Sequence, residues 1–172
     1  PCQRTWRGHA PADEQAHIRD VLPGCGAAPR PPPPGFTASR VAEVVVSHCS
    51  MDLAWLRLEL SLLERAGLLW VGRVVVYSKC SRPVVNASTW WAVHTLPNVG
   101  RNDHTYAAHI ATSHGCLLPM VFFLKDRMAP GWSQMKNRAV PLERMAHLVA
   151  SAGFACGFGP ADANGCLLYT SD

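Results

Sequence analysis

The residues best suited to bind a ligand lie in one short polar stretch, residues 96–106. Gly100 and Arg101 stand immediately before a predicted helix. Free backbone N–H groups and the helix dipole favour an anion at such a position, and the planar Arg101 side chain can donate two parallel hydrogen bonds to phosphate or carboxylate. The stretch therefore predicts an anion site. The alternative is an ordinary capped loop in which Arg101 is solvated or paired with Asp103.

A second candidate is Asp126, which follows the apolar residues 118–124. A carboxylate just after a buried strand is a usual ligand for a hard divalent cation such as Mg²⁺ or Mn²⁺. Lys125 and Arg127 flank this acid, so a surface ion pair explains the same residues. The sequence leaves both interpretations open.

Other common catalytic patterns do not occur in the sequence. His104 and His109 are five residues apart, which is about 140° around a helix, so they do not share a face as zinc ligands would. We therefore expect His109 to be structural. The chain has no glycine-rich dinucleotide or Walker motif and no nucleophile elbow, which counts against dinucleotide oxidoreductases, P-loop enzymes and triad hydrolases.

Two valine-rich strands, residues 41–47 and 73–78, are expected to position these candidates. Runs of this kind are typical of strands that are buried on both faces. We expect a helix between them, with Ser50 as its N-cap and Gly67 just after its end. A strand, a helix and a strand within about forty residues predict a parallel βαβ unit. Two apolar stripes predict that the helix packs on more than one side; they are Leu53, Leu56, Leu60 and Leu63, and Met51, Trp55, Leu58 and Leu62.

The remaining elements complete an open, three-layer α/β fold with a mainly parallel sheet, a Rossmann-like arrangement. They are a short strand over 90–96, a helix capped by Asn102 or Asp103 that runs to Ser113, a strand over 118–124, and a helix over 141–152. In such sheets, ligands bind beyond the carboxyl ends of the strands. The segments at that edge are 48–52, 78–81, 97–104 and 125–127.

Composition divides the chain into three parts. Residues 1–40 have no apolar periodicity and contain a proline run, so we expect a disordered leader. Residues 41–165 form the α/β domain, which we expect to be truncated at its C-terminus. Residues 166–172 resemble a translated sequencing adapter and are expected not to be native. The formal charge of +4 is not gathered in a basic stripe, so we do not expect nucleic-acid binding. No apolar run is long enough to predict a membrane span.

Two local features concern covalent modification. Cys49 and Cys80 each follow a predicted strand, and adjacent parallel strands could bring them close. Disulfide connectivity cannot be deduced from sequence. We expect Cys49 and Cys80 to be two reduced thiols. Asn86, Ala87 and Ser88 match the acceptor pattern for N-glycosylation, which matters only in a secretory compartment.

Four blocks of the chain resemble an uncharacterised group, domain-of-unknown-function family 3431. They are residues 44–56, 76–79, 96–110 and 118–126, and the most specific is the run 97–101 followed by His104, Thr105 and Tyr106. The layout is also similar to the nucleotide-sugar half of GT-A glycosyltransferases. The resemblance implies a glycosyltransferase-like domain that binds a nucleotide sugar or another phosphorylated or anionic ligand. A non-catalytic glycan- or protein-binding module of the same fold is the alternative.

The resemblance also implies roles for individual residues. Asp126 and His104 would be catalytic, and Asp126 would hold a divalent cation (Mn or Mg) if one binds. Residues implied in substrate binding are His48, Asp52, Asn98, Gly100, Arg101, Asp103, Thr105 and Tyr106.

Overall fold

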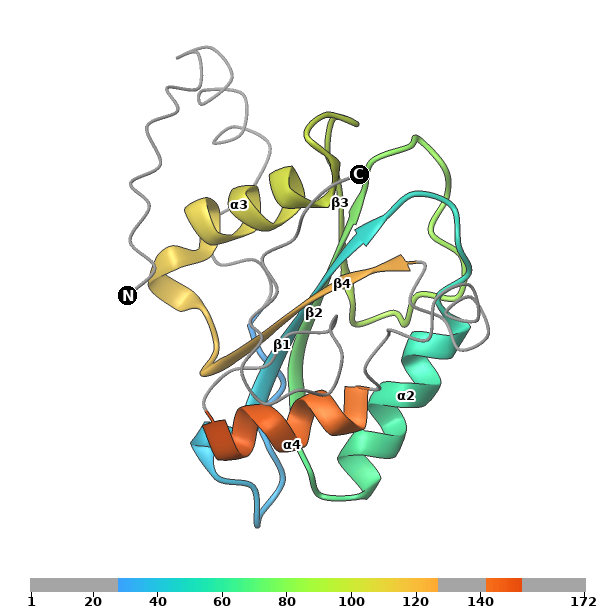
Figure 1. The fold of residues 1–172 in the computed structure, drawn as a ribbon. Helices are drawn as coiled ribbons and strands as arrows, with labels where there is room; N and C mark the ends of the chain where they lie inside the picture. The colour runs from blue at the N-terminus through green and yellow to red at the C-terminus, as the bar shows by residue number, and fades with distance from the viewer. Residues whose placement is uncertain (1–27, 127–141, 153–172) are drawn as a thin grey trace.

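The computed structural model, which describes residues 28–126 and 142–152, contains a four-stranded parallel sheet (Figure 1). Its strand order is β3-β2-β1-β4. Val44 of β1 lies opposite Val74 of β2 and Phe122 of β4. The predicted parallel α/β fold is therefore confirmed. The strands are β1 (Val41–His48), β2 (Trp70–Ser78), β3 (Ala92–Thr95) and β4 (Met120–Lys125).

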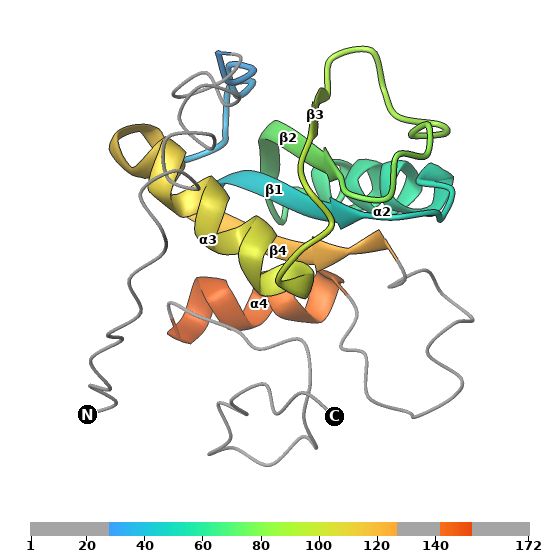
Figure 2. The same cartoon turned by 90° about the horizontal axis from the view of Figure 1, so that it is seen from above.

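Helices cover both faces of this sheet and make three layers (Figure 2). Helices α2 (Ala54–Arg65) and α4 (Leu142–Ala152) contribute to the larger apolar core, and α3 (Arg101–Ser113) packs over the smaller one on the opposite face. Short 3-10 turns, η1 (Ala38–Arg40) and η2 (His114–Cys116), precede β1 and follow α3. None of the helices in the described ranges is long and apolar enough for a membrane span.

The larger core follows from the leucine spacing of α2. Leu56, Leu60 and Leu63 are buried against the sheet, as their spacing predicts. The second stripe is packed only in part: Trp55 packs against the larger core, whereas Leu58 is 58% exposed and Leu62 is 46% exposed. A helix in an outer layer has only one face against the sheet, so its opposite face points to solvent.

The start of α2 differs from the prediction that Ser50 caps it. Helix α2 begins at Ala54, and Asp52 Oδ1 accepts the Ala54 N–H at 2.7 Å. The Ser50 N–H instead donates to Asp126. At the other end, Gly67 follows the C-cap in the left-handed conformation at φ 66°, as predicted.

The start of α3 also lies earlier than predicted. The N-cap is Gly100 rather than Asn102 or Asp103, and no side chain caps the helix. Gly100 has φ 59°, and a Cβ atom there would lie 2.7 Å from the His104 Cβ. The turn therefore requires glycine for its backbone conformation and for space.

Part of the expected leader contacts the domain. The Arg30 N–H donates to the Gly72 carbonyl at 2.7 Å, and its guanidinium lies 4.2 Å from the ring centre of Trp70 and 4.4 Å from that of Trp90. No pattern in the sequence indicated this cation–π contact, because it joins segments that are far apart in the chain. The expectations for residues 1–27, for Pro141 and for residues 153–172 fall outside the described residues.

Candidate functional site

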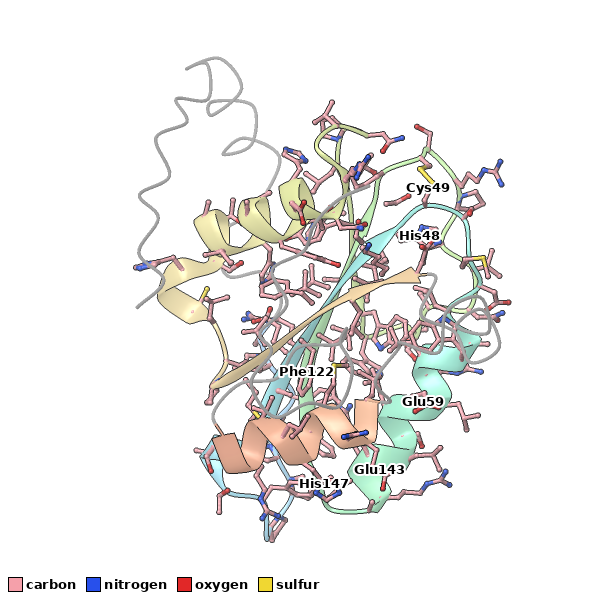
Figure 3. All side chains as sticks on the ribbon, in the orientation of Figure 1. His48, Cys49, Glu59, Phe122, Glu143 and His147 are labelled. Carbon is pink, nitrogen blue, oxygen red and sulfur yellow. A yellow bond between two sulfur atoms is a disulfide. The ribbon has the colours of Figure 1, made fainter. Side chains whose placement is uncertain are left out.

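The carboxyl ends of the four strands meet at one edge of the sheet, where the ligand site is expected. The Lys79 N–H, just after β2, donates to the His48 carbonyl at the end of β1 at 2.9 Å. The Leu96 N–H, just after β3, donates to the Ser78 carbonyl at 3.0 Å. Figure 3 shows His48 and Cys49 at this edge, away from Glu143 and His147 on α4. The topology thus gathers the described residues of all four predicted segments.

Asp126 fixes the loop that follows β1. Its Oδ2 accepts the backbone N–H groups of Cys49 and Ser50 at 2.8 Å and that of Met51 at 3.1 Å. The residue is only 4% exposed. Three donors stabilise the carboxylate and compensate for its burial, so Asp126 organises the loop much as a bound anion would organise a nest of amides.

The described residues do not fit a resident divalent cation. Asp126 already accepts three N–H groups through one oxygen. Within residues 28–126 and 142–152, no group of three or more His, Cys, Asp or Glu side chains is placed to hold a metal ion.

Cys49 and Cys80 form a disulfide, so the expectation of two reduced thiols was wrong. Their Cα atoms lie 4.8 Å apart, within the range that a disulfide spans. The pairing register of β1 and β2 places His48 opposite Ser78, and the chain continues from each strand in the same direction. The bond joins the loops that follow β1 and β2.

Lys79 is a functional candidate that the sequence-based site omitted. Its Nζ donates to the carbonyl of Val99 at 2.7 Å and to that of Arg101. Burial lowers the pKa of Lys79 below its ordinary value, although the charge of Asp103 acts in the opposite direction. A lysine directly after a buried strand, at the carboxyl edge, was the available signal. Lys79 holds the turn that leads into α3.

The turn before α3 exposes the residues that could meet an anion. Asn98, Gly100, Arg101 and Asp103 are all exposed. Arg101 has φ 52°, so it follows Gly100 in a second left-handed conformation. An ion pair between Arg101 and Asp103, which was the alternative interpretation, is not among the salt bridges of the described residues.

Several predicted binding residues instead make structural contacts within the fold. Thr105 is fully buried, and its hydroxyl lies 3.2 Å from that of Ser47. His48 is 1% exposed, and its Nε2 lies 3.1 Å from the Met51 carbonyl. The Tyr106 ring packs against Phe123, with 4.9 Å between ring centres. Thr105 and His48 therefore position the edge of the sheet from inside the fold, and Tyr106 is half-buried.

Asp52 and His104 are the remaining candidates. Both Asp52 oxygens have partners, since Oδ1 accepts from Ala54 and Oδ2 accepts the Asn86 amide at 2.6 Å. His104 is partly exposed one turn into α3, and its N–H donates to the Gly100 carbonyl at 3.0 Å. Of the two predicted catalytic residues, Asp126 is buried in a hydrogen-bonded clamp, and His104 lies beside the exposed turn.

A buried charged network lies beneath α3, away from this edge. Glu43 and Arg73 are register partners on β1 and β2, and Arg73 donates to both Glu43 oxygens at 2.6 and 2.9 Å. His109 Nε2 lies 3.3 Å from Glu43 Oε1, and His109 Nδ1 lies 2.9 Å from the Tyr77 hydroxyl. The expectation that His109 is structural is confirmed.

Glu43 and Arg73 were not singled out from the sequence. A signal existed, since each is a charged residue inside a strand that was predicted to be buried on both faces. Burial alone raises the pKa of Glu43, but hydrogen bonds from His109 and Arg73, together with their charges, lower it below 4.5 overall. The network therefore keeps a carboxylate charged inside the protein.

Comparison of the chain with protein-family models, with curated proteins and with solved structures found no match in any of the three. The resemblance to domain-of-unknown-function family 3431 and to GT-A transferases stays a prediction.

Proposed function

We propose that this is a glycosyltransferase-like domain that binds the phosphate groups of a nucleotide sugar at the carboxyl edge of its sheet. The observation that carries the proposal is the exposed Arg101 at the start of α3, a thirteen-residue helix whose N-terminus has no side-chain cap. Unsatisfied N–H groups at a helix start attract anions. A guanidinium beside them adds a planar pair of donors for phosphate.

Two fixed contacts support this location by holding the turn in place. The buried Lys79 ammonium binds the carbonyls of Val99 and Arg101, so the backbone before α3 is fastened to the end of β2. Preorganisation of this kind lowers the entropy that ligand binding would otherwise cost. His104, one turn further along, is the residue that we propose for proton transfer with a bound substrate.

Replacing Arg101 tests the proposal. We expect Arg101→Ala to change the free energy of unfolding by less than about 0.5 kcal/mol, because an exposed side chain leaves no cavity. The same variant should lose about 1.5–3 kcal/mol of binding free energy, or about ten- to a hundredfold in affinity, because a charge-assisted contact is removed. Calorimetry against UDP- and GDP-sugars, with and without manganese, measures the affinity, and a thermal melt measures the stability.

Arg57 provides a matched control. It is an exposed arginine on α2, so Arg57→Ala removes the same charge from another element. Affinity should fall for Arg101→Ala and remain unchanged for Arg57→Ala. A large drop in the melting temperature of Arg101→Ala would make Arg101 structural and remove the main support for an anion site. Failure of the folded wild type to bind any of the nucleotide sugars would reject the transferase proposal.

A non-catalytic module for an anionic glycan or a protein partner is the second candidate. The engagement of Asp126 favours it, because this acid accepts three loop amides and has little exposed surface. The two candidates differ in turnover. A transferase releases nucleoside diphosphate from its donor with time, whereas a binding module holds an anionic glycan or a partner without consuming a donor.

A further inference from the structure

We propose that Asn86 is a site of N-linked glycosylation. Asn86, Ala87 and Ser88 form the acceptor sequence Asn-x-Ser, and no other Asn-x-Ser or Asn-x-Thr occurs in the chain. The sequence pattern alone is common by chance. Three structural observations that are independent of the pattern support this site, and none of them depends on the proposed ligand site.

The first observation is the position of Asn86 on a surface loop with a fixed backbone. Asn86 is exposed in the segment that joins β2 to β3. The Leu53 N–H donates to the Val85 carbonyl at 3.2 Å, and Val84 and Ala87 pack against the larger core. The loop is therefore anchored on both sides of Asn86. A glycan attached there would extend into solvent without displacing core residues.

The second observation is that the hydrogen bond from the Asn86 side chain to Asp52 is compatible with a glycan. Asn86 Nδ2 donates to Asp52 Oδ2 at 2.6 Å. A primary amide carries two N–H donors, and glycosylation replaces only one of them. The remaining N–H can still donate to Asp52, whose other oxygen accepts the N–H of Ala54 at the start of α2. The folded structure thus accommodates the modified side chain.

The third observation concerns the redox compartment. The disulfide between Cys49 and Cys80 lies in the same part of the fold, and Cys116 is also disulfide-bonded. Structural disulfides form and persist in oxidising compartments such as the secretory pathway. Attachment of glycans to Asn-x-Ser sites takes place on secreted proteins. Disulfide pairing and the acceptor sequence therefore point to the same cellular environment.

The reaction needs one co-reactant, an oligosaccharide linked to a polyprenyl diphosphate. The Asn86 Nδ2 forms a bond to C1 of the first sugar, and the bond between C1 and the diphosphate oxygen breaks. The electron pair of that bond leaves with the polyprenyl diphosphate, and Nδ2 loses one proton. No oxidation or reduction occurs in this step.

Expression of the chain through a eukaryotic secretory pathway, behind an added signal peptide, tests the site. We expect the secreted protein to carry one glycan that peptide N-glycosidase removes and that glycopeptide mass spectrometry places on Asn86. Asn86→Gln and Ser88→Ala should each abolish it, and Ser88→Thr should retain it because threonine also completes the acceptor sequence. Ser88→Ala keeps the backbone bond in which the Ser88 carbonyl accepts the Trp91 N–H, so its fold should be preserved.

A secreted protein with the Cys49–Cys80 disulfide intact and an unmodified Asn86 would overturn the proposal. So would a glycan that persists in Asn86→Gln, because the attachment would then lie elsewhere. A mass shift that disappears in both loss variants and survives in Ser88→Thr would support it. Non-reducing peptide mapping of the same samples checks the disulfide in every variant.

Discussion

The two faces of the sheet are stabilised in different ways. The face under α2 and α4 is an apolar core of leucine, valine and a few larger side chains. The face under α3 has a smaller apolar cluster, and beside it lie buried polar and charged groups that include Glu43, Arg73 and His109. One face depends on shape and apolar area, and the other depends on hydrogen bonds and ion pairs among buried polar groups. Substitutions in the two faces should therefore destabilise the protein in different ways, through a cavity in the apolar face and through an unpaired buried charge in the polar face.

The largest effect is expected from breaking the buried ion pair. Glu43→Ala would leave the Arg73 guanidinium, which is 5% exposed, without its carboxylate partner. Removing one member of a buried pair costs about 3–5 kcal/mol, because the remaining charge stays desolvated. Urea denaturation should show this loss in the free energy of unfolding.

Glu59→Ala is the matched control for that experiment. Glu59 lies half-buried on α2, which Figure 3 labels, so its removal should cost much less than the loss of one member of a buried pair. Equal losses for Glu43→Ala and Glu59→Ala would mean that the buried pair contributes nothing beyond a half-buried carboxylate.

The next effect belongs to the apolar face. Leu56 is fully buried in the larger core, so Leu56→Ala should cost about 3 kcal/mol through lost burial and the cavity that remains. Leu58 is 58% exposed on the same helix, and Leu58→Ala should cost less than about 0.5 kcal/mol. Equal losses measured by urea denaturation would restore the original expectation that both stripes of α2 are packed.

The two faces also differ in how far they could be predicted. The leucine spacing of α2 and the valine runs of β1 and β2 predicted the apolar face, because the spacing of apolar residues along an element reflects which of its side chains are buried. The polar face depends on the pairing of Glu43 with Arg73, which a register shift between Ala42 and Glu43 sets. The residue pattern of one strand does not determine which residues of a neighbouring strand lie opposite it.

The candidate site shows the same division. The parallel sheet that gathers its residues at the carboxyl edge follows from the order of strands and helices, and that fold was predicted correctly. The clamp between Asp126 and the loop at 49–51 joins residues about 75 positions apart, and it exists because β4 lies beside β1. The neighbours of a strand are a property of the whole fold, so the sequence alone suggested an exposed acid.

Lowering the pH should reduce the stability that the polar face contributes and leave the contribution of the apolar face unchanged, without any large substitution. The pKa of Glu43 is lower in the folded protein than its ordinary 4.5, so the unfolded chain binds the proton more readily. The resulting stability is present above about pH 4.5 and is lost as the pH falls through the folded pKa. Protonation leaves the side chain in place, so this loss should be smaller than that of Glu43→Ala.

Stability curves from about pH 6 to about pH 3 would measure this contribution. Leu56→Ala should lie below the wild type and run parallel to it, because it leaves the carboxylate intact. Glu43→Gln cannot titrate at this position and should give a flatter curve. Parallel curves for all three proteins would show that Glu43 does not contribute to the acid sensitivity.

The smallest effect is expected from Tyr77→Phe, which removes only the hydroxyl that lies 2.9 Å from His109 Nδ1. At neutral pH the loss should be about 1 kcal/mol, the net value of one buried hydrogen bond.

Alkaline solution sharpens the test, because burial and the charge of Glu43 raise the pKa of Tyr77 from 10.0 to about 12. A raised pKa gives stability that is complete below the unfolded pKa and is lost as the pH rises towards the folded value. The wild type and Leu56→Ala should therefore share a loss of stability above pH 10, and Tyr77→Phe should lack that part of it. If all three proteins lose stability equally between about pH 10 and about pH 12, the Tyr77 hydroxyl is not held within the charged network.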